Sequence, residues 1–180
     1  VLCPLAVLLA TVLCCMVAVG DPWLETTIDL SPRTGVAGPN CLAYCDWDNT
    51  VWVAGTTVGP ASGYVAVAID GATLSPVAKA HVGADGVNAL CYAAPENKLY
   101  ATNSGWYGDG TTLTVIDCGT RQVLSYVEVG TGPLKMCYSS ISNKLYCLTS
   151  VHPDLAVVDC ASDTVLARLQ TGTYVPSDLL

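Results

Sequence analysis

Short apolar runs alternate with turn-forming residues along almost the whole chain. Beyond the first twenty residues, the runs are rich in Val, Leu, Tyr and Thr, and each is bounded by Gly, Pro, Asn, Asp or Ser. Runs of this length and composition are typical of β-strands separated by turns. No run of helical period is long enough to compete, so the pattern predicts an all-β protein.

The runs belong to an internal repeat. Residues 90–100 align with residues 136–146 without a gap, at an offset of 137 minus 91, which is 46, and residues 42–52 form a more divergent copy. Each copy continues into a second motif that ends in an acid, at Asp70, Asp117 and Asp159. Behind each acid, a Val-rich run closes on a glycine. Each repeat therefore contains four predicted strands.

Four strands in about 45 residues are typical of a β-propeller blade. Its antiparallel strands form one sheet that packs against the neighbouring blades. The sequence predicts about three such four-stranded antiparallel blades, over residues 38–83, 84–130 and 131–172. In the last blade, we expect an inner strand at 134–139, then strands at 144–150 and 155–160, and an outer strand at 164–171. In the blade before it, we expect the inner strand at 87–93.

The two ends of the repeat region also carry strand patterns. Residues 24–30 alternate like an outer strand, so we expect a closing strand and linker over 24–37, and residues 173–180 look like the start of another blade. Closed propellers typically have four to eight blades. The sequence therefore predicts a fragment of a larger closed propeller, whose uncovered edges and faces favour self-association.

The first twenty residues carry no charge and end in small residues just before a polar break. This pattern predicts a secretory signal over 1–20, with a membrane anchor as the alternative. It indicates a secreted, periplasmic or cell-surface protein that meets a membrane only through an uncleaved N-terminal segment. Only 12% of residues are charged and the net charge is −8, which argues against nucleic acid as a partner.

With the repeat aligned, the chain resembles the YVTN family of β-propeller repeats, found in bacterial secreted and archaeal surface-layer proteins. The naming motif Tyr-Val-Thr-Asn is matched by Tyr100-Ala101-Thr102-Asn103. The resemblance implies the propeller fold. It leaves the function open, because related propellers include surface proteins, binding modules and enzymes of lactonase or oxidoreductase type.

The recurring acids Asp70, Asp117 and Asp159 are the first candidates for chemistry. Each is followed three residues later by Ser or Thr, so its carboxylate can accept backbone hydrogen bonds and hold the turn into the outer strand. We assign them this structural role. Neither His81 nor His152 has metal-ligand spacing to other residues, so the sequence predicts no metal and no cofactor.

The cysteines beyond the signal form an odd set of seven. Cys137 and Cys147 fall on adjacent antiparallel strands, and their residue numbers sum to 284, as do those of Tyr138 and Tyr146. This spacing allows a disulfide between Cys137 and Cys147 in an export context. Buried free thiols are the alternative, since cysteine also packs as a small hydrophobic residue.

The connections from second to third strand vary between repeats. The middle one contains Trp106, Tyr107 and Asp109 in a glycine-rich setting, which is typical of surfaces that bind glycans or proteins, unless Trp106 folds over the blade edge. The sequence thus favours a non-enzymatic protein that presents loops for protein or glycan binding. A propeller enzyme is the alternative, although the inner strands offer it only Asn40, Asn88 and Lys135.

Overall fold

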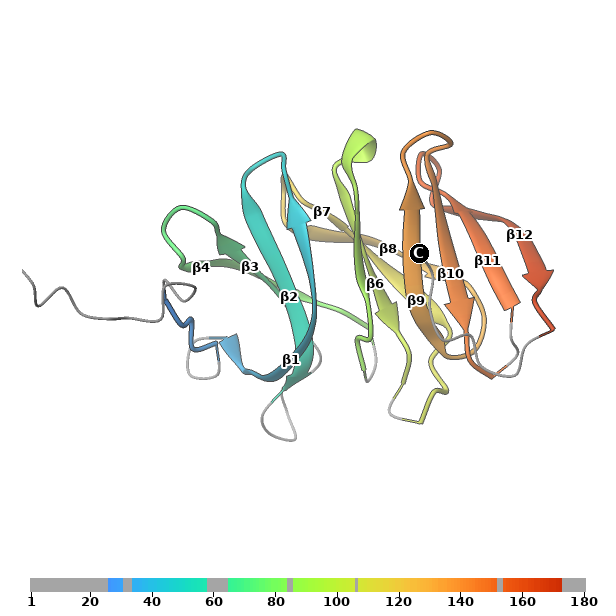
Figure 1. Cartoon of the computed structure of the whole chain (residues 1–180), viewed down its shortest axis with the longest axis horizontal. Helices are drawn as coiled ribbons and strands as arrows, with labels where there is room; N and C mark the ends of the chain where they lie inside the picture. Colours follow the sequence, from blue (N-terminus) through green and yellow to red (C-terminus); the bar gives the residue numbers. More distant parts are fainter. Residues whose placement is uncertain are drawn as a thin grey trace, which may run out of the picture.

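The chain forms three four-stranded antiparallel β-sheets (Figure 1). This computed structural model describes residues 26–30, 34–57, 65–83, 86–105, 107–151 and 154–172. A single 3-10 turn, η1 (Ala94–Glu96), interrupts the strands within these residues. The strands are β1 (Val36–Cys45), β2 (Thr50–Thr57), β3 (Val65–Asp70), β4 (Pro76–His81), β5 (Leu90–Ala93), β6 (Lys98–Asn103), β7 (Thr112–Asp117), β8 (Gln122–Glu128), β9 (Pro133–Ser139), β10 (Lys144–Thr149), β11 (Asp154–Asp159) and β12 (Thr164–Gln170).

Each sheet is one repeat of the sequence, with its strands in chain order. We call β1–β4 the first sheet, β5–β8 the second sheet and β9–β12 the third sheet. The predicted four-stranded antiparallel units are confirmed, and in the third sheet each strand boundary lies within one residue of its expected place. The inner strand of the second sheet is shorter than expected, because it begins at Leu90.

Two tight turns shape every sheet. The turn before the second strand ends on an asparagine with positive φ, a conformation that asparagine tolerates better than most residues. The turn before the fourth strand also contains a residue with positive φ, but here the residue type differs between sheets. These left-handed residues are Asn49, Asn97 and Asn143 in the earlier turn, and Leu74, Arg121 and Asp163 in the later one.

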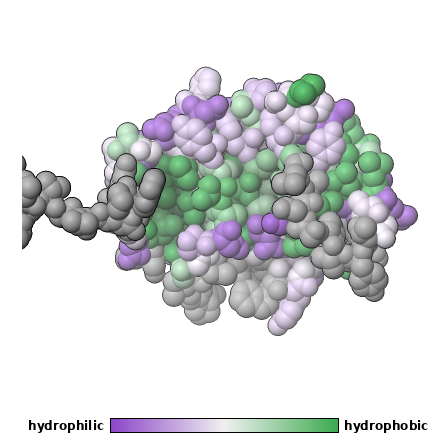
Figure 2. Space-filling view, viewed as in Figure 1, coloured by the Kyte–Doolittle hydropathy of each residue, from purple (hydrophilic) through white to green (hydrophobic). Residues whose placement is uncertain are grey.

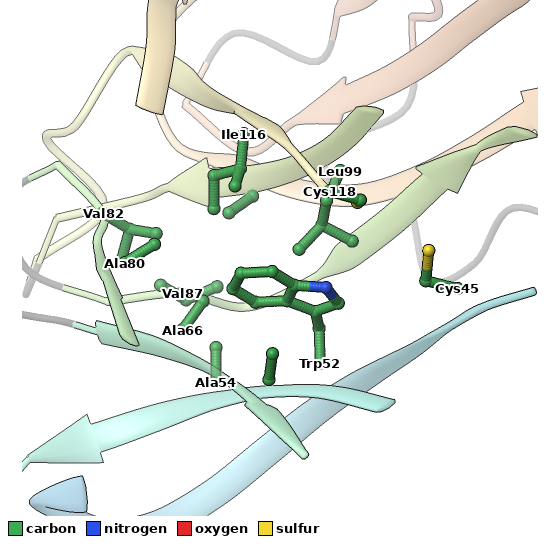
Figure 3. Packing of buried hydrophobic residues seen from close by; sticks show 12 residues of the cluster. Cys45, Trp52, Ala54, Ala66, Ala80, Val82, Val87, Leu99, Ile116 and Cys118 are labelled. Atoms are coloured by element: carbon green, nitrogen blue, oxygen red, sulfur yellow. The ribbon is translucent and has the colours of Figure 1, made fainter. Parts of the chain in front are cut away.

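The sheets pack face to face and fan apart towards their outer strands. The inner strands β1, β5 and β9 contact one another in series, and the outer strands of neighbouring sheets contact less. Between the first and second sheets lies Trp52, which is fully buried (Figure 3). Ala54 and Ala66 leave room for the indole ring, which lies close to Val87. A large side chain against small ones lets the two sheets pack closely here.

The second interface is built from Tyr100 and aliphatic residues. Tyr100, Leu113 and Val115 of the second sheet are fully buried against Leu145 and Cys147 of the third. Burying each of these side chains contributes about 1.5–3 kcal/mol. Each interface therefore has a buried cluster of its own.

The expected closing strand is not formed over residues 26–30, where it is described. Instead, Leu30 and the half-buried Ile28 pack on the outer face of the first sheet, against Val53 and Ile69. A strand needs a ladder partner, and the described residues provide no neighbouring sheet beyond the first one for it to join. The alternating apolar residues therefore cover the sheet face.

Two predicted segments lie outside the described residues. They are the secretory signal over 1–20 and the start of a further blade over 173–180. In the part of the chain that the structure describes, no helix is long and apolar enough to cross a membrane.

Candidate functional site

The variable loops gather along one edge of the three sheets. We call this the loop edge and define it by the described parts of the connections between second and third strands and between outer and inner strands of successive sheets, residues 82–83, 86–89, 104–105, 107–111, 129–132 and 150–151. It forms the lower side of the molecule in Figure 1, and the tight turns form the opposite side. In Figure 2, hydrophobic residues cross the middle of the molecule and hydrophilic ones flank them. Loops held by a rigid sheet scaffold are the usual place for binding residues.

The β6–β7 connection is a compact loop. Its base is closed by a hydrogen bond from the Gly110 amide to the Ser104 carbonyl at 2.9 Å. Gly105 has a φ of +76°, and a Cβ there would lie 2.5 Å from the Gly110 nitrogen. The loop therefore requires glycine at position 105, where the chain turns back on itself.

The same loop is bonded to the loops beside it. The Gly132 amide donates to the Gly110 carbonyl at 2.7 Å, which ties the loop to the β8–β9 connection. The Ser104 hydroxyl donates to the Pro133 carbonyl and accepts from the Asn88 amide at 2.9 Å. The Ser104 side chain is buried, so these contacts hold three loops in fixed relative positions.

Tyr107 and Asp109 stand at the tip of this fixed loop. The Tyr107 side chain is 88% exposed, and Asp109 is also exposed. The third predicted site residue, Trp106, lies outside the described residues. An exposed aromatic ring on a rigid base can stack on an apolar ligand surface, and a nearby carboxylate can accept hydrogen bonds from ligand hydroxyl or amide groups.

The three recurring acids lie in the turns on the opposite edge. Asp70 accepts the Thr73 amide at 2.6 Å and its hydroxyl at 2.9 Å, and these bonds hold the pKa of Asp70 below its ordinary value. Asp159 accepts the Ser162 hydroxyl at 2.6 Å, which lowers its pKa in the same way. These contacts are those of a structural turn, and they match the role assigned from the sequence.

Asp117 follows the same arrangement, accepting the Thr120 amide at 2.7 Å.

A second repeated bond was not anticipated from the sequence. In each sheet, a tyrosine hydroxyl of the inner strand donates to the asparagine side chain five residues later, at 3.0–3.2 Å. The signal was present, because tyrosine and asparagine recur at this spacing in every repeat, at Tyr44 and Asn49, Tyr92 and Asn97, and Tyr138 and Asn143.

The disulfide expected between Cys137 and Cys147 is not formed. The strand register places Cys137 opposite Tyr146 and Cys147 opposite Met136, so the two cysteine side chains point to opposite faces of the third sheet. The pairing is one residue away from the one that the sum of 284 implied. All seven described cysteines are free thiols.

Most of these thiols are shielded from solvent. Burial raises the pKa of Cys41 to about 11 and the pKa values of Cys91 and Cys147 to about 12. Such thiols stay protonated at neutral pH, and the thiolate is the reactive form. These three cysteines therefore act as core residues.

The inner strands carry few polar groups. The Asn88 amide is bonded to Ser104, and Asn40 and Lys135 are exposed on different strands. Within the described ranges, no three His, Cys, Asp or Glu side chains are grouped so that they could hold a metal ion. His81 is exposed, and His152 lies outside the described part of the chain.

The chain matches no protein-family profile and no curated protein. Among solved structures it is similar to hydrazine synthase of Kuenenia stuttgartiensis, with a TM-score of 0.62 and 18% sequence identity. The matched region covers 86% of this chain and 41% of that chain, so this chain spans less than half of that relative. At this identity the likeness concerns the fold alone. Together with the three fanned sheets, it supports a β-propeller-like all-β fold.

Proposed function

We propose that this chain is a secreted or surface-attached, non-enzymatic repeat protein whose loop edge binds a glycan or a protein. Its three sheets are then blades of a larger closed β-propeller of the YVTN type. Support comes from the repetition of one four-stranded unit and from the way neighbouring sheets pack, with inner strands close and outer strands apart.

The exposed Tyr107 carries the binding proposal. A tyrosine that is 88% exposed leaves its apolar ring in water, yet the loop below it is held in place by bonds to two neighbouring connections. A ligand that stacks on this ring pays little to order the loop, because the loop is already ordered. Asp109 supplies an acceptor at the same tip, a combination that suits the apolar face and hydroxyl groups of a sugar.

A glycan microarray tests this function. The labelled chain is compared with Tyr107→Ala, Asp109→Ala and the control Tyr126→Ala, which removes another exposed tyrosine, from the outer strand β8. For the glycans that bind the unsubstituted chain, we expect Tyr107→Ala to abolish binding, Asp109→Ala to weaken it and Tyr126→Ala to leave it unchanged. Removing an aromatic at the centre of an interface costs about 2 kcal/mol or more, roughly a thirtyfold loss of affinity.

Two results would count against this function. Binding that survives Tyr107→Ala would move the site away from the β6–β7 loop. Binding that falls equally in all three variants would indicate adhesion through exposed aromatic residues in general. A chain that binds no glycan but binds a purified surface protein through Tyr107 would identify the ligand class as protein.

A further inference from the structure

The interface between the second and third sheets contains a charged link at its rim. Lys98 lies 2.8 Å from one carboxylate oxygen of Asp163, and the Tyr100 hydroxyl donates to the other at 2.7 Å. The side chains of Lys98 and Asp163 are only 13% and 18% exposed. The carboxylate of the third sheet is thus gripped by two side chains of the second.

At the first interface the equivalent turn residue also forms an ion pair, with the charges reversed and with a partner in the β1–β2 turn rather than on a strand. There Arg121 of the second sheet reaches Asp48 of the first at 3.5 Å. Arg121 and Asp163 occupy equivalent positions, since each is the left-handed residue in the last turn of its sheet. At both interfaces, this turn residue carries the charge opposite to that of its partner on the preceding sheet.

The third sheet repeats, on its far face, the lysine and tyrosine that bind the carboxylate at the second interface. Lys144 and Tyr146 stand where Lys98 and Tyr100 stand in the second sheet. Tyr146 pairs with Cys137 and Val157 across the sheet, on the side away from the core shared with the second sheet. Asp159 lies across from Lys144, but its carboxylate accepts bonds from Ser162.

The apolar part of this face is repeated as well. Leu155 and Val157 of the third sheet correspond to Leu113 and Val115, which are fully buried where the third sheet covers the second. Leu169, beside Leu155 on the outer strand, is 53% exposed. Val157 itself is 9% exposed. We call this the free face, because the described residues contain no further sheet beside it, and it lies at the right-hand end of the row of sheets in Figure 1.

The first sheet offers no match for this face. Its left-handed turn residue is Leu74, so a second copy of the chain stacking its first sheet here would set a leucine, not a carboxylate, beside Lys144. Burying an ammonium group without a partner is costly. The repeated Lys and Tyr therefore favour an occupant that carries an acid at this place.

We propose that the free face of the third sheet binds a further four-stranded antiparallel sheet that presents a carboxylate from the left-handed residue of its last turn, gripped by Lys144 and Tyr146. The proposal concerns the sheet interface, and it does not depend on ligand binding at the loop edge.

An extended chain tests the proposal. A second copy of residues 131–172 is joined directly after Gly172, so that the Asp163 of the added copy would face Lys144 and Tyr146. The matched control carries Asp163→Leu in the added copy only, which imitates Leu74. In each background, Lys144→Met and Tyr146→Phe are compared by urea unfolding, and the acetylation rate of Lys144 is followed by mass spectrometry.

With the acid present, we expect each substitution to lower the folding equilibrium constant about tenfold to a hundredfold, as for loss of a hydrogen bond to a charged group. With leucine in its place, and in the 180-residue chain, the change should stay within about twofold. Lys98→Met in the same chains gives the value for an interface already formed. Lys144 should react more slowly with the acid present than with leucine.

Equal effects of Lys144→Met in the acid and leucine backgrounds would overturn the proposal. So would a Lys144 that is acetylated in the acid version as fast as in the 180-residue chain. An added copy that stays unfolded in the acid version, shown by rapid hydrogen exchange throughout it, would overturn the proposal too.

Discussion

Removing one hydroxyl group from Tyr100 should weaken the whole row of sheets. In Tyr100→Phe, the ring remains in place but the 2.7 Å bond to Asp163 is lost. Hydrogen bonds to charged groups contribute about 1.5–3 kcal/mol. Lys98 still pairs with Asp163, whose side chain is 18% exposed, so we expect the lower end, about 1.5 kcal/mol. For a chain of this size, that lowers the Tm by roughly 3–6 °C.

The same variant should change how stability depends on alkaline pH. Burial, and then the bond to Asp163, raises the pKa of Tyr100 above its ordinary value. Because the pKa is raised in the folded state, the neutral hydroxyl stabilises the fold fully below the unfolded pKa of about 10. This stabilisation is lost as the pH rises above that value. The unsubstituted chain should therefore lose stability above pH ~10 more steeply than Tyr100→Phe.

Urea unfolding followed by circular dichroism, at pH 7 and at pH 11, measures both effects. The control is Tyr126→Phe, which makes the same chemical change on a side chain that is 57% exposed. We expect the control to lie within about 0.5 kcal/mol of the unsubstituted chain. A Tyr100→Phe chain as stable as the control, with an unchanged slope against urea, would refute the role given to this hydroxyl.

Three further outcomes follow from the geometry. Gly105→Ala should cost roughly 1–2 kcal/mol in a urea titration, because φ there is +76° and the new methyl group would lie 2.5 Å from a backbone nitrogen. Cys137 and Cys147 should both be alkylated in the denatured chain without reductant, and a peptide map that shows them linked would contradict the register. In Ser162→Ala, the pKa of Asp159 should rise towards its ordinary value in a carboxyl NMR titration, and the variant should lose less stability than the unsubstituted chain as the pH falls below about 4.

The repeat made most of the fold predictable. Strands β10, β11 and β12 were expected nearly where they occur, because apolar runs and turn residues return at the same spacing in each copy. The turn acids were also predictable, since a carboxylate followed by Ser or Thr three residues later accepts hydrogen bonds from the turn between them. Local patterns of this kind act within a few residues, and the sequence displays them directly.

Register and long-range placement were harder to predict. Counting between strands put Cys137 opposite Cys147, but the turn that ends on the left-handed Asn143 pairs Ser139 with Lys144 and shifts the register by one. A shift of one residue reverses which face a side chain occupies. The hydrogen bonds that fix the β6–β7 loop through Ser104 link segments that no spacing in the sequence connects.

The left-handed turn residue has a consequence for how such a chain folds. Repeats that resemble one another can stack in the wrong order, which is a common way for repeat proteins to misfold. Here Arg121 and Asp163 stand at the same position with opposite charges, so Arg121 pairs with Asp48 and Asp163 with Lys98, whereas stacking the third sheet on the first would set Asp163 beside Asp48. The charge of a single side chain per repeat thereby favours the native order of sheets that have nearly the same shape.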